Sequence, residues 1–350
     1  MTESIDRRSF LATTAGLAAA ALPNVLPGSS PEVLVRRADP VMIASHNAMP
    51  KALPLAYAAL LAGGHPVDAA VAGAEVVEND PSDHSVGLGG LPNELGVVEL
   101  DASVMDGVTG LCGAVASLQK IRNPAKVARL VMQHTKHALL VGEGALAFAR
   151  AHGFKEEELL TTEAREIWLY WKRSHSDKDF WLTPTKETIP EHVRKWFGIT
   201  GTVHFSARTA DGRMGACTST SGMAFKLPGR VGDSPIVGAG LFTDDSGSAG
   251  STGRGESNIA VCGAHTIVEA IRAGKHPTDA CLVAAKRILD GTRAPWLKDA
   301  QGRPDFDIIF YAVDRDGRYG SASLYGGNRF AVADSKGARV EDSAFVLPKR

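Results

Sequence analysis

The spacing of apolar residues predicts helices in the first half of the chain. Residues 66–77 carry apolar side chains at the three- and four-residue spacing of one helix face: Val67, Ala70, Val71, Ala74 and Val77. Pro66 suits the first helical position. The same pattern predicts further helices over residues 53–61, 123–137 and 144–152. We expect a short buried strand over residues 41–44, and paired strands over 96–100 and 104–108 that turn at 101–103.

Strand patterns dominate the second half. Residues 202–207 alternate, residues 211–213 (DGR) form a turn, and residues 214–220 return, which predicts a hairpin. A strand over 238–242 is expected to lead into a loop of small residues over 246–255. Helices are then expected over 257–273 and 277–289, and strands over 306–313 and 318–323. This order has no strand–helix–strand alternation, which favours an α+β layered body over a parallel doubly wound sheet.

A charged segment separates the two halves. Residues 155–200 contain Trp168, Trp171, Trp181 and Trp196 and lose their periodicity after about residue 172. We interpret this segment as a solvated connector, and its tryptophans either anchor it to the body or line a cleft. Anchoring is the simpler interpretation.

Composition narrows the class of protein. The 350 residues hold 38 Lys and Arg against 39 Asp and Glu, for a net charge of -1. Such a balance gives no electrostatic reason to bind nucleic acid or an acidic membrane. The 37 glycines indicate many tight turns and close approaches of the backbone.

The first thirty residues have the pattern of an export signal. Residues 4–11 read SIDRRSFL, with paired arginines before an aromatic residue and a leucine, as in twin-arginine signals. The apolar run over 11–22 is shorter than the roughly 20 residues that span a bilayer, so it resembles the h-region of a removed signal. The alternative is an ordinary helix with two chance arginines. We expect a soluble periplasmic protein with no membrane segment in its mature form.

The cysteines and histidines show no metal-site spacing. There is no CxxC or HExxH motif, and we expect no cofactor and no required metal. An oxidising compartment would permit a Cys262–Cys281 bridge, although small buried hydrophobes are the simpler interpretation. Residues 86–90 (VGLGG) lack the GxGxxG frame of a dinucleotide site, which favours close packing or a site wall.

A threonine at the start of the hairpin is the candidate nucleophile. An ordinary strand threonine is the alternative for the pair Gly201-Thr202. If the chain is cut between them, Thr202 gains an α-amine with a pKa near 7.7–8.0. That amine can act as base for its own hydroxyl. Gly201 tolerates the strained backbone that an N→O acyl shift needs.

The motifs around this threonine resemble a known family. Residues 217–222 (CTSTSG), 229–235 (GRVGDSP) and 251–253 (STG) are similar to the glycosylasparaginase branch of the N-terminal-nucleophile hydrolases. The similarity extends upstream through residues 86–93, 105–107 and 140–143. Members of that branch cleave themselves and hydrolyse the amide that links N-acetylglucosamine to asparagine.

The resemblance implies roles for residues from Thr202 onward. Thr202 would be the nucleophile, and Thr220 a hydroxyl that hydrogen-bonds near the free amine. Thr252 and Gly253 would stabilise the tetrahedral oxyanion, a contribution of about 3 kcal/mol per donor. Their alternative is the N-cap region of the helix expected at 257.

Two charged residues would hold the substrate. By the resemblance, Arg230 binds the α-carboxylate and Asp233 the α-amine, and Gly253 contributes to the same pocket. A guanidinium fork matches a carboxylate with two hydrogen bonds, which agrees with this assignment. A loop-stabilising Arg230–Asp233 ion pair is the alternative.

Three positions depart from the family pattern. Gly201 stands where the family usually has an aspartate, so self-cleavage must use a different base or proceed more slowly. His46-Asn47 replaces the Thr-Trp of the substrate pocket, which affects substrate choice more than amide chemistry. His204 stands where the family generally has glycine.

The resemblance predicts an amidohydrolase of the four-layer αββα type. It would cut itself before Thr202 and join residues 31–201 and 202–350 in one domain that associates with other such αβ units. The first candidate substrate is N4-(β-N-acetylglucosaminyl)-L-asparagine. The alternatives are an isoaspartyl dipeptidase or L-asparaginase, and a periplasmic amino-acid-binding protein without turnover.

Overall fold

The computed structural model describes residues 38–174, 193 and 201–350. Their strands are β1 (Val41–Ser45), β2 (Leu100–Asp106), β3 (Cys112–Leu118), β4 (Leu139–Val141), β5 (Val203–Arg208), β6 (Met214–Thr220), β7 (Leu241–Thr243), β8 (Gly247–Gly253), β9 (Ile308–Asp314), β10 (Tyr319–Tyr325), β11 (Arg329–Asp334), β12 (Gly337–Asp342) and β13 (Ala344–Leu347). Their helices are η1 (His46–Ala48), α2 (Ala52–Leu61), α3 (Pro66–Glu78), α4 (Pro124–His134), α5 (Gly142–Ala151), α6 (Thr162–Ser174), α8 (Gly255–Ile259), α9 (Gly263–Arg272), α10 (Pro277–Gly291) and η3 (Pro295–Leu297).

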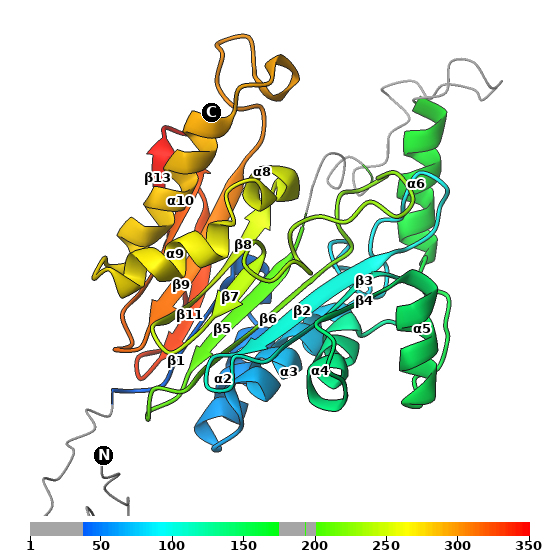
Figure 1. Ribbon diagram of the computed structural model, residues 1–350. Helices are drawn as coiled ribbons and strands as arrows, with labels where there is room; N and C mark the ends of the chain where they lie inside the picture. The colour runs from blue at the N-terminus through cyan, green and yellow to red at the C-terminus, as the bar shows by residue number, and fades with distance from the viewer. Residues whose placement is uncertain (1–37, 175–192, 194–200) are drawn as a thin grey trace, which may run out of the picture. The chain divides into compact units, whose positions relative to one another are not determined.

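The body of residues 37–350 is layered. Among the described strands, eight form one sheet in the order β12-β11-β1-β5-β6-β2-β3-β4, and five form another in the order β13-β10-β9-β8-β7. The sheets face each other, since β5 and β6 contact β8, and β1 contacts β9. Helices α2 to α5 cover the outer face of the larger sheet, and α9 and α10 cover the smaller one (Figure 1). The predicted α+β class and four-layer αββα arrangement are confirmed.

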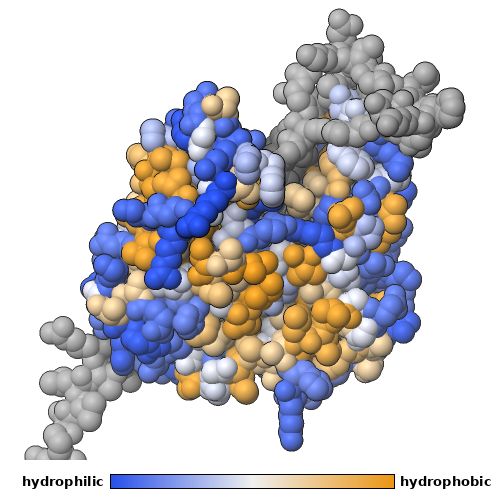
Figure 2. Space-filling model, turned by 45° about the horizontal axis from the view of Figure 1, so that its top comes forward, coloured by the Kyte–Doolittle hydropathy of each residue, from blue (hydrophilic) through white to orange (hydrophobic). Residues whose placement is uncertain are grey.

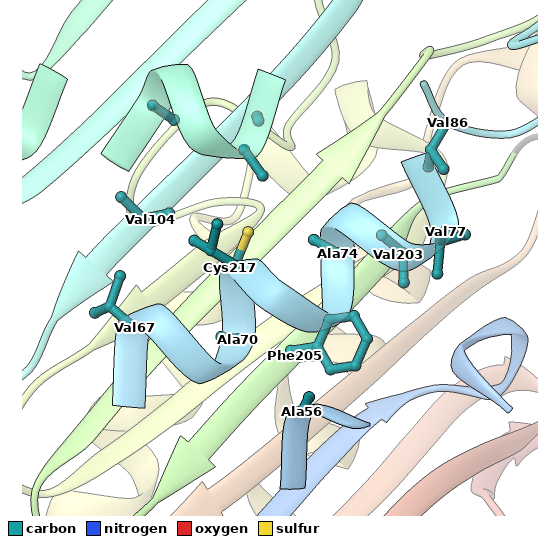
Figure 3. Close-up of a cluster of buried hydrophobic side chains, with 14 of the residues drawn as sticks. Ala56, Val67, Ala70, Ala74, Val77, Val86, Val104, Val203, Phe205 and Cys217 are labelled. Atoms are coloured by element: carbon teal, nitrogen blue, oxygen red, sulfur yellow. The ribbon is translucent and has the colours of Figure 1, made fainter. Parts of the chain in front are cut away.

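Strand β5 shows how the sequence assigns a face to each layer. Its odd-numbered side chains, Val203, Phe205 and Ala207, are buried in the apolar core shared with α2, α3 and α4. Figure 3 shows Phe205 against α3. Gly73 of α3 makes this approach possible, because a Cβ there would lie 2.7 Å from Cε1 of Phe205. The even-numbered side chains point toward the other sheet, as strand alternation requires.

The segment at 101–103 is not a turn. Strand β2 runs unbroken through it and pairs with β6 and β3. The sequence interpretation was wrong here because Asp101 resembles a turn residue. The buried Asp101 instead accepts a hydrogen bond from the backbone N–H of Ser117, at 2.7 Å. Strand β3, which supplies that N–H, was not expected from the sequence.

Two further expectations in the second half are corrected. Most of the expected loop over 246–255 is strand β8, whose small residues fit between the two sheets. The expected helix over 257–273 is two helices, α8 and α9, because Cys262 adopts a left-handed φ of 46° between them. The hairpin of β5 and β6 is confirmed, with registers such as Phe205 opposite Cys217.

The beginning of the expected connector is anchored to the body. In α6, Trp168 Nε1 donates to the Glu94 carbonyl at 3.2 Å, and Trp171 stacks on Phe225 at 4.6 Å between ring centres. The anchoring interpretation is confirmed for these two residues. Trp181, Trp196 and the rest of the connector after residue 174 lie outside the described residues, as do the export signal and most of the residues before the first strand.

Several smaller expectations are also settled. All four cysteines are free thiols, so the Cys262–Cys281 bridge is not formed; Cys281 is buried, but Cys262 is exposed. Residues 86–90 pack closely, as expected, because a Cβ on Gly87 would lie 2.1 Å from the Glu78 carbonyl oxygen. Within the described residues, no helix is both long enough and apolar enough to cross a bilayer. The face shown in Figure 2 carries both hydrophilic and hydrophobic patches.

Candidate active site

One cavity of about 500 Å³ brings the sequence-predicted site residues together. It lies where β5 begins and where β6 and β8 end. Its lining includes every residue predicted to act: Gly201, Thr202, Thr220, Arg230, Asp233, Thr252 and Gly253. His46, Asp305, Phe306 and Asn328 also contribute to the wall. Residues from distant parts of the chain therefore share one cavity.

The two threonines form a hydrogen-bonded chain at one end of the cavity. Thr202 is buried and its hydroxyl donates to Thr220 Oγ1, at 3.2 Å. Thr220 in turn donates to the carbonyl oxygen of Gly201, at 2.7 Å, and accepts from the Gly222 N–H at 2.8 Å. A hydrogen bond to a carbonyl oxygen polarises its carbon. The Gly201–Thr202 peptide bond therefore has a hydroxyl beside it and a donor on its oxygen.

Gly201 has no space for a side chain. A Cβ there would lie 1.9 Å from Cβ and 2.7 Å from Oγ of Ser85. Ser85 is fixed from the other side, because its carbonyl accepts both the N–H and the hydroxyl of Ser221, at 2.8 and 2.9 Å. An aspartate at 201 would collide with this serine, which gives a physical reason for the glycine.

The charged residues lie along another wall. Arg230 Nε and Nη2 both donate to Oε1 of Glu256, at 2.9 and 2.8 Å. The alternative of a loop-stabilising Arg230–Asp233 pair is wrong, because Asp233 instead accepts from Ser251 at 2.6 Å and Asn258 at 2.7 Å. The carboxylate of Glu256 is thus bound to Arg230. The resemblance implies that Arg230 would bind a carboxylate of the substrate.

Thr252 and Gly253 end strand β8 at the cavity. The hydroxyl of Tyr311 donates to Thr252 Oγ1 at 3.2 Å, and burial raises the pKa of Tyr311, so it stays a protonated donor. Gly253 has a φ of 127°, and a Cβ there would lie 2.5 Å from the Asp307 carbonyl oxygen. Both conditions require glycine. The helix N-cap is Arg254, so the N-cap alternative does not describe these two residues.

A buried lysine supports the loop that carries Arg230. Lys226 is fully buried, donates to the Glu99 carbonyl at 3.1 Å and lies 4.0 Å from Oδ2 of Asp101. Burial lowers the pKa of Lys226 and Asp101 opposes this change. Glu99 accepts the Gly229 N–H at 3.1 Å, next to Arg230. Sequence reasoning missed this support because Asp101 was interpreted as a turn residue.

His204 lies between the sheets, behind the threonines. Its Nδ1 is 2.8 Å from Thr218 Oγ1 and its Nε2 is 2.8 Å from Ser206 Oγ. Burial lowers the pKa of His204 to about 3, so the ring is neutral. Gly250 leaves space for it, since a Cβ there would lie 2.1 Å from Cε1 of the ring. This accounts for a histidine where the family generally has glycine.

His46 and Asn47, which stand at the positions of the family's Thr-Trp, have different surroundings. His46 lines the cavity, and burial and then Arg329 lower its pKa, whereas Asp83 raises it. Asn47 is turned to Ser45, whose hydroxyl donates to Asn47 Oδ1 at 2.6 Å. Ser45 Oγ also accepts the His204 N–H at 3.1 Å. In the described part of the chain, no group of three or more His, Cys, Asp or Glu could hold a metal.

Comparison with known proteins places the chain in a family. The family model described as Asparaginase matches residues 29–294. An N(4)-(β-N-acetylglucosaminyl)-L-asparaginase of Elizabethkingia miricola is 39% identical over 98% of this chain and 96% of its own. The protein of that name from Mus musculus is 35% identical over 81% of this chain and 85% of its own. The one from Rattus norvegicus is 36% identical over 73% of this chain and 79% of its own. The resemblance found in the sequence motifs is confirmed, and the chain belongs to the asparaginase family of N-terminal-nucleophile hydrolases.

Proposed function

We propose that this protein is an amidohydrolase that cuts itself before Thr202 and then hydrolyses the β-amide of N4-(β-N-acetylglucosaminyl)-L-asparagine. One observation carries the proposal: a single cavity gathers Thr202, Thr220, Arg230, Asp233 and the Thr252–Gly253 corner. The names of the relatives support the substrate, and family membership supports the amide chemistry.

The reaction would use Thr202 both as nucleophile and as base. Once the Gly201–Thr202 bond is cut, the new α-amine can take the proton of the neighbouring hydroxyl. The hydroxyl oxygen attacks the β-carbonyl carbon of the substrate, and the negative oxygen that forms is stabilised at Thr252 and Gly253. The amide nitrogen leaves with a proton, giving a β-aspartyl ester on Thr202. Water then hydrolyses that ester and releases aspartate.

The charged wall would orient the aspartyl part of the substrate. Arg230 would exchange Glu256 for the substrate α-carboxylate, to which a guanidinium makes two parallel hydrogen bonds. Asp233 carries the opposite charge for the α-amine. Its fixed position, bonded to Ser251 and Asn258, supports this role because a held carboxylate loses little freedom on binding.

The leaving group is the less constrained part of the substrate. Asn47 is turned toward Ser45, so the residue aligned with the family's tryptophan adds no apolar wall. An isoaspartyl dipeptide or asparagine therefore remains the second candidate. Measuring aspartate release from glycosylasparagine, a β-aspartyl dipeptide and asparagine separates these substrates by kcat/KM.

Self-cleavage is tested by the mass of the purified chain. We expect two fragments, the second beginning at Thr202, and an intact chain with no activity for Thr202→Ala. Thr209→Ala is a matched control, because Thr209 follows the same strand but bonds Asp211 and the Arg213 carbonyl. An intact wild-type chain that binds aspartate without turnover would instead identify an amino-acid-binding protein.

Export and assembly complete the proposal. Residues 1–30 would direct the folded chain to the periplasm by the twin-arginine route and then be removed. The exposed apolar residues Leu139 and Val141 on β4, at the edge of the larger sheet, support association of αβ units. N-terminal sequencing of the exported protein and light scattering of the purified protein test these two points.

A further inference from the structure

Self-cleavage needs a base that the finished enzyme does not need. Before the cut, the nitrogen of Thr202 is part of an amide and cannot accept a proton. The hydroxyl must nevertheless lose its proton to attack the Gly201 carbonyl. This step rests on the proposed function, and residue 201, being glycine, offers no carboxylate of its own.

The carboxylates of the cavity wall are engaged elsewhere. Glu256 is bonded to Arg230, and Asp233 to Ser251 and Asn258. Asp305 accepts from Nη1 of Arg350, at 3.3 Å. Asp307 accepts the N–H of Ile308 and the amide of Asn328, at 2.8 and 2.7 Å. None of these contacts reaches Gly201. In the described part of the chain, the carboxylate that is connected to Gly201 comes from outside the lining.

That carboxylate is Asp83, and its connection is Ser85. Asp83 Oδ1 accepts both the backbone N–H of Ser85, at 2.9 Å, and the Ser85 hydroxyl. The Ser85 side chain is buried and fills the space that a side chain on Gly201 would take. A hydroxyl that donates to a carboxylate keeps its lone pairs free and becomes a better proton acceptor.

We propose that Asp83, acting through the Ser85 hydroxyl, accepts the threonine proton during self-cleavage. The Thr202 hydroxyl, which donates to Thr220 in the structure, would turn to Ser85 for this step. The bond from Thr202 Oγ to the Gly201 carbonyl carbon forms as the proton passes to Ser85 and from Ser85 to Asp83. The carbon–nitrogen bond then breaks, and the proton returns to the leaving nitrogen as the free amine. Water hydrolyses the resulting ester, which gives the Gly201 carboxylate and restores the Thr202 hydroxyl. Asp83 is thus a positioning residue that works through Ser85.

The chain contains its own control for this arrangement. Asp80 and Ser82 repeat the same Asp-x-Ser pattern three residues earlier. Asp80 Oδ1 accepts the Ser82 N–H at 3.0 Å and the Ser82 hydroxyl at 2.6 Å. That pair faces solvent. The same substitution can be made in either pair, but only the second pair adjoins Gly201, through Ser85.

The test follows cleavage of the full chain after cell-free synthesis, by intact mass and gel, between about pH 4 and 8. We expect Asp83→Asn to slow cleavage at neutral pH by roughly 10- to 100-fold, within the range of general-base effects. It should also change the dependence of the cleavage rate on pH. Asparagine keeps the acceptor oxygen for Ser85, so a purely structural role would leave both readouts unchanged.

The remaining variants separate the explanations. Asp80→Asn should cleave like the wild type, and Ser85→Ala should be as slow as Asp83→Asn, with no further loss in the double variant. Equal melting temperatures for Thr202→Ala with and without Asp83→Asn exclude misfolding as the cause. The proposal is overturned if Asp83→Asn cleaves at the normal rate. It is also overturned if His46→Gln is the only one of these variants that cleaves slowly. If the wild-type chain itself stays intact, it is the proposed function that fails.

Discussion

The two faces of strand β5 belong to layers of opposite character. Toward the helices, Phe205 and its neighbours are packed among apolar side chains. Toward the second sheet, His204 and Ser206 join a hydrogen-bonded row that continues through Ser248 Oγ, 2.7 Å from Ser206 Oγ, to Thr243, at 2.8 Å. Thr202 precedes His204 by two residues and lies on the same side of the strand as this row. The apolar layer supplies burial, and the polar row leads to Thr202, the proposed nucleophile.

The layers also contain buried groups that respond to pH with opposite sign, Glu78 on the helix side and His204 between the sheets. Glu78 of α3 accepts from Ser219 Oγ at 2.7 Å and the Ala125 N–H at 3.0 Å, and burial raises its pKa to about 7. Burial lowers the pKa of His204 to about 3. Both groups are therefore neutral in the folded protein over part of the acid range. The comparison predicts that Glu78 makes the protein less stable as pH rises and that His204 makes it less stable as pH falls.

Removing the largest apolar side chain of β5 should have the largest effect. Phe205 is fully buried against α3, so Phe205→Ala should lower the free energy of unfolding by about 3–5 kcal/mol. Urea denaturation measures the change. Phe345→Ala is the control, because Phe345 is 53% exposed and its truncation should cost far less. Equal losses would mean that the helix-facing layer is not the main source of stability.

Glu78→Gln tests the titration of the helix layer. With a folded pKa of about 7 and an unfolded one near 4.5, the wild type prefers to fold with a protonated Glu78. Its stability therefore falls as pH rises through this interval. Relative to the glutamine variant, which does not titrate, the wild type should lose about 3 kcal/mol between about pH 4 and 8. Denaturation at several pH values measures the difference, and a constant difference would contradict a raised pKa. The Asn123 amide, 3.1 Å from Oε2, can turn to meet the new NH₂ group.

The sequence predicted the features that depend on nearby residues. The alternation in β5, the helical period of α3 and the motifs at 229–235 and 251–253 each lie within one short segment. These local patterns were sufficient for the hairpin, the layered α+β class and the set of candidate residues that share the cavity.

Features that depend on distant contacts were not predictable in the same way. Glu256 meets Arg230 from 26 residues further along the chain, and Ser85 meets Gly201 from a separate loop. Asp101 has turn-like chemistry, yet burial beside Lys226 keeps it in a strand. In the sequence, the small residues of β8 resemble a loop. The structure shows that Gly250 must be small because the His204 ring faces it.

His204→Gln tests the polar row in the opposite pH direction. The folded ring stays neutral down to about pH 3, whereas an unfolded histidine takes up a proton below about 6.5. Stability from this group is complete above the unfolded pKa and is lost as pH falls. Relative to the glutamine variant, the wild type should lose about 2 kcal/mol between about pH 7 and 5. A parallel pH dependence of wild type and His204→Gln would contradict a depressed pKa.

The smallest expected effect tests whether the row acts as a unit. Ser248→Ala removes a hydroxyl between Ser206 and Thr243 and should cost about 1–2 kcal/mol, because it leaves buried partners unsatisfied. Ser246→Ala, in the exposed part of the preceding turn, is the control and should cost less. Adding Ser206→Ala removes one of the unsatisfied partners, so the double variant should lose less than the sum of the single losses. Strict additivity in urea denaturation would mean that the hydroxyls contribute independently, and the row between the sheets would then be a set of separate bonds.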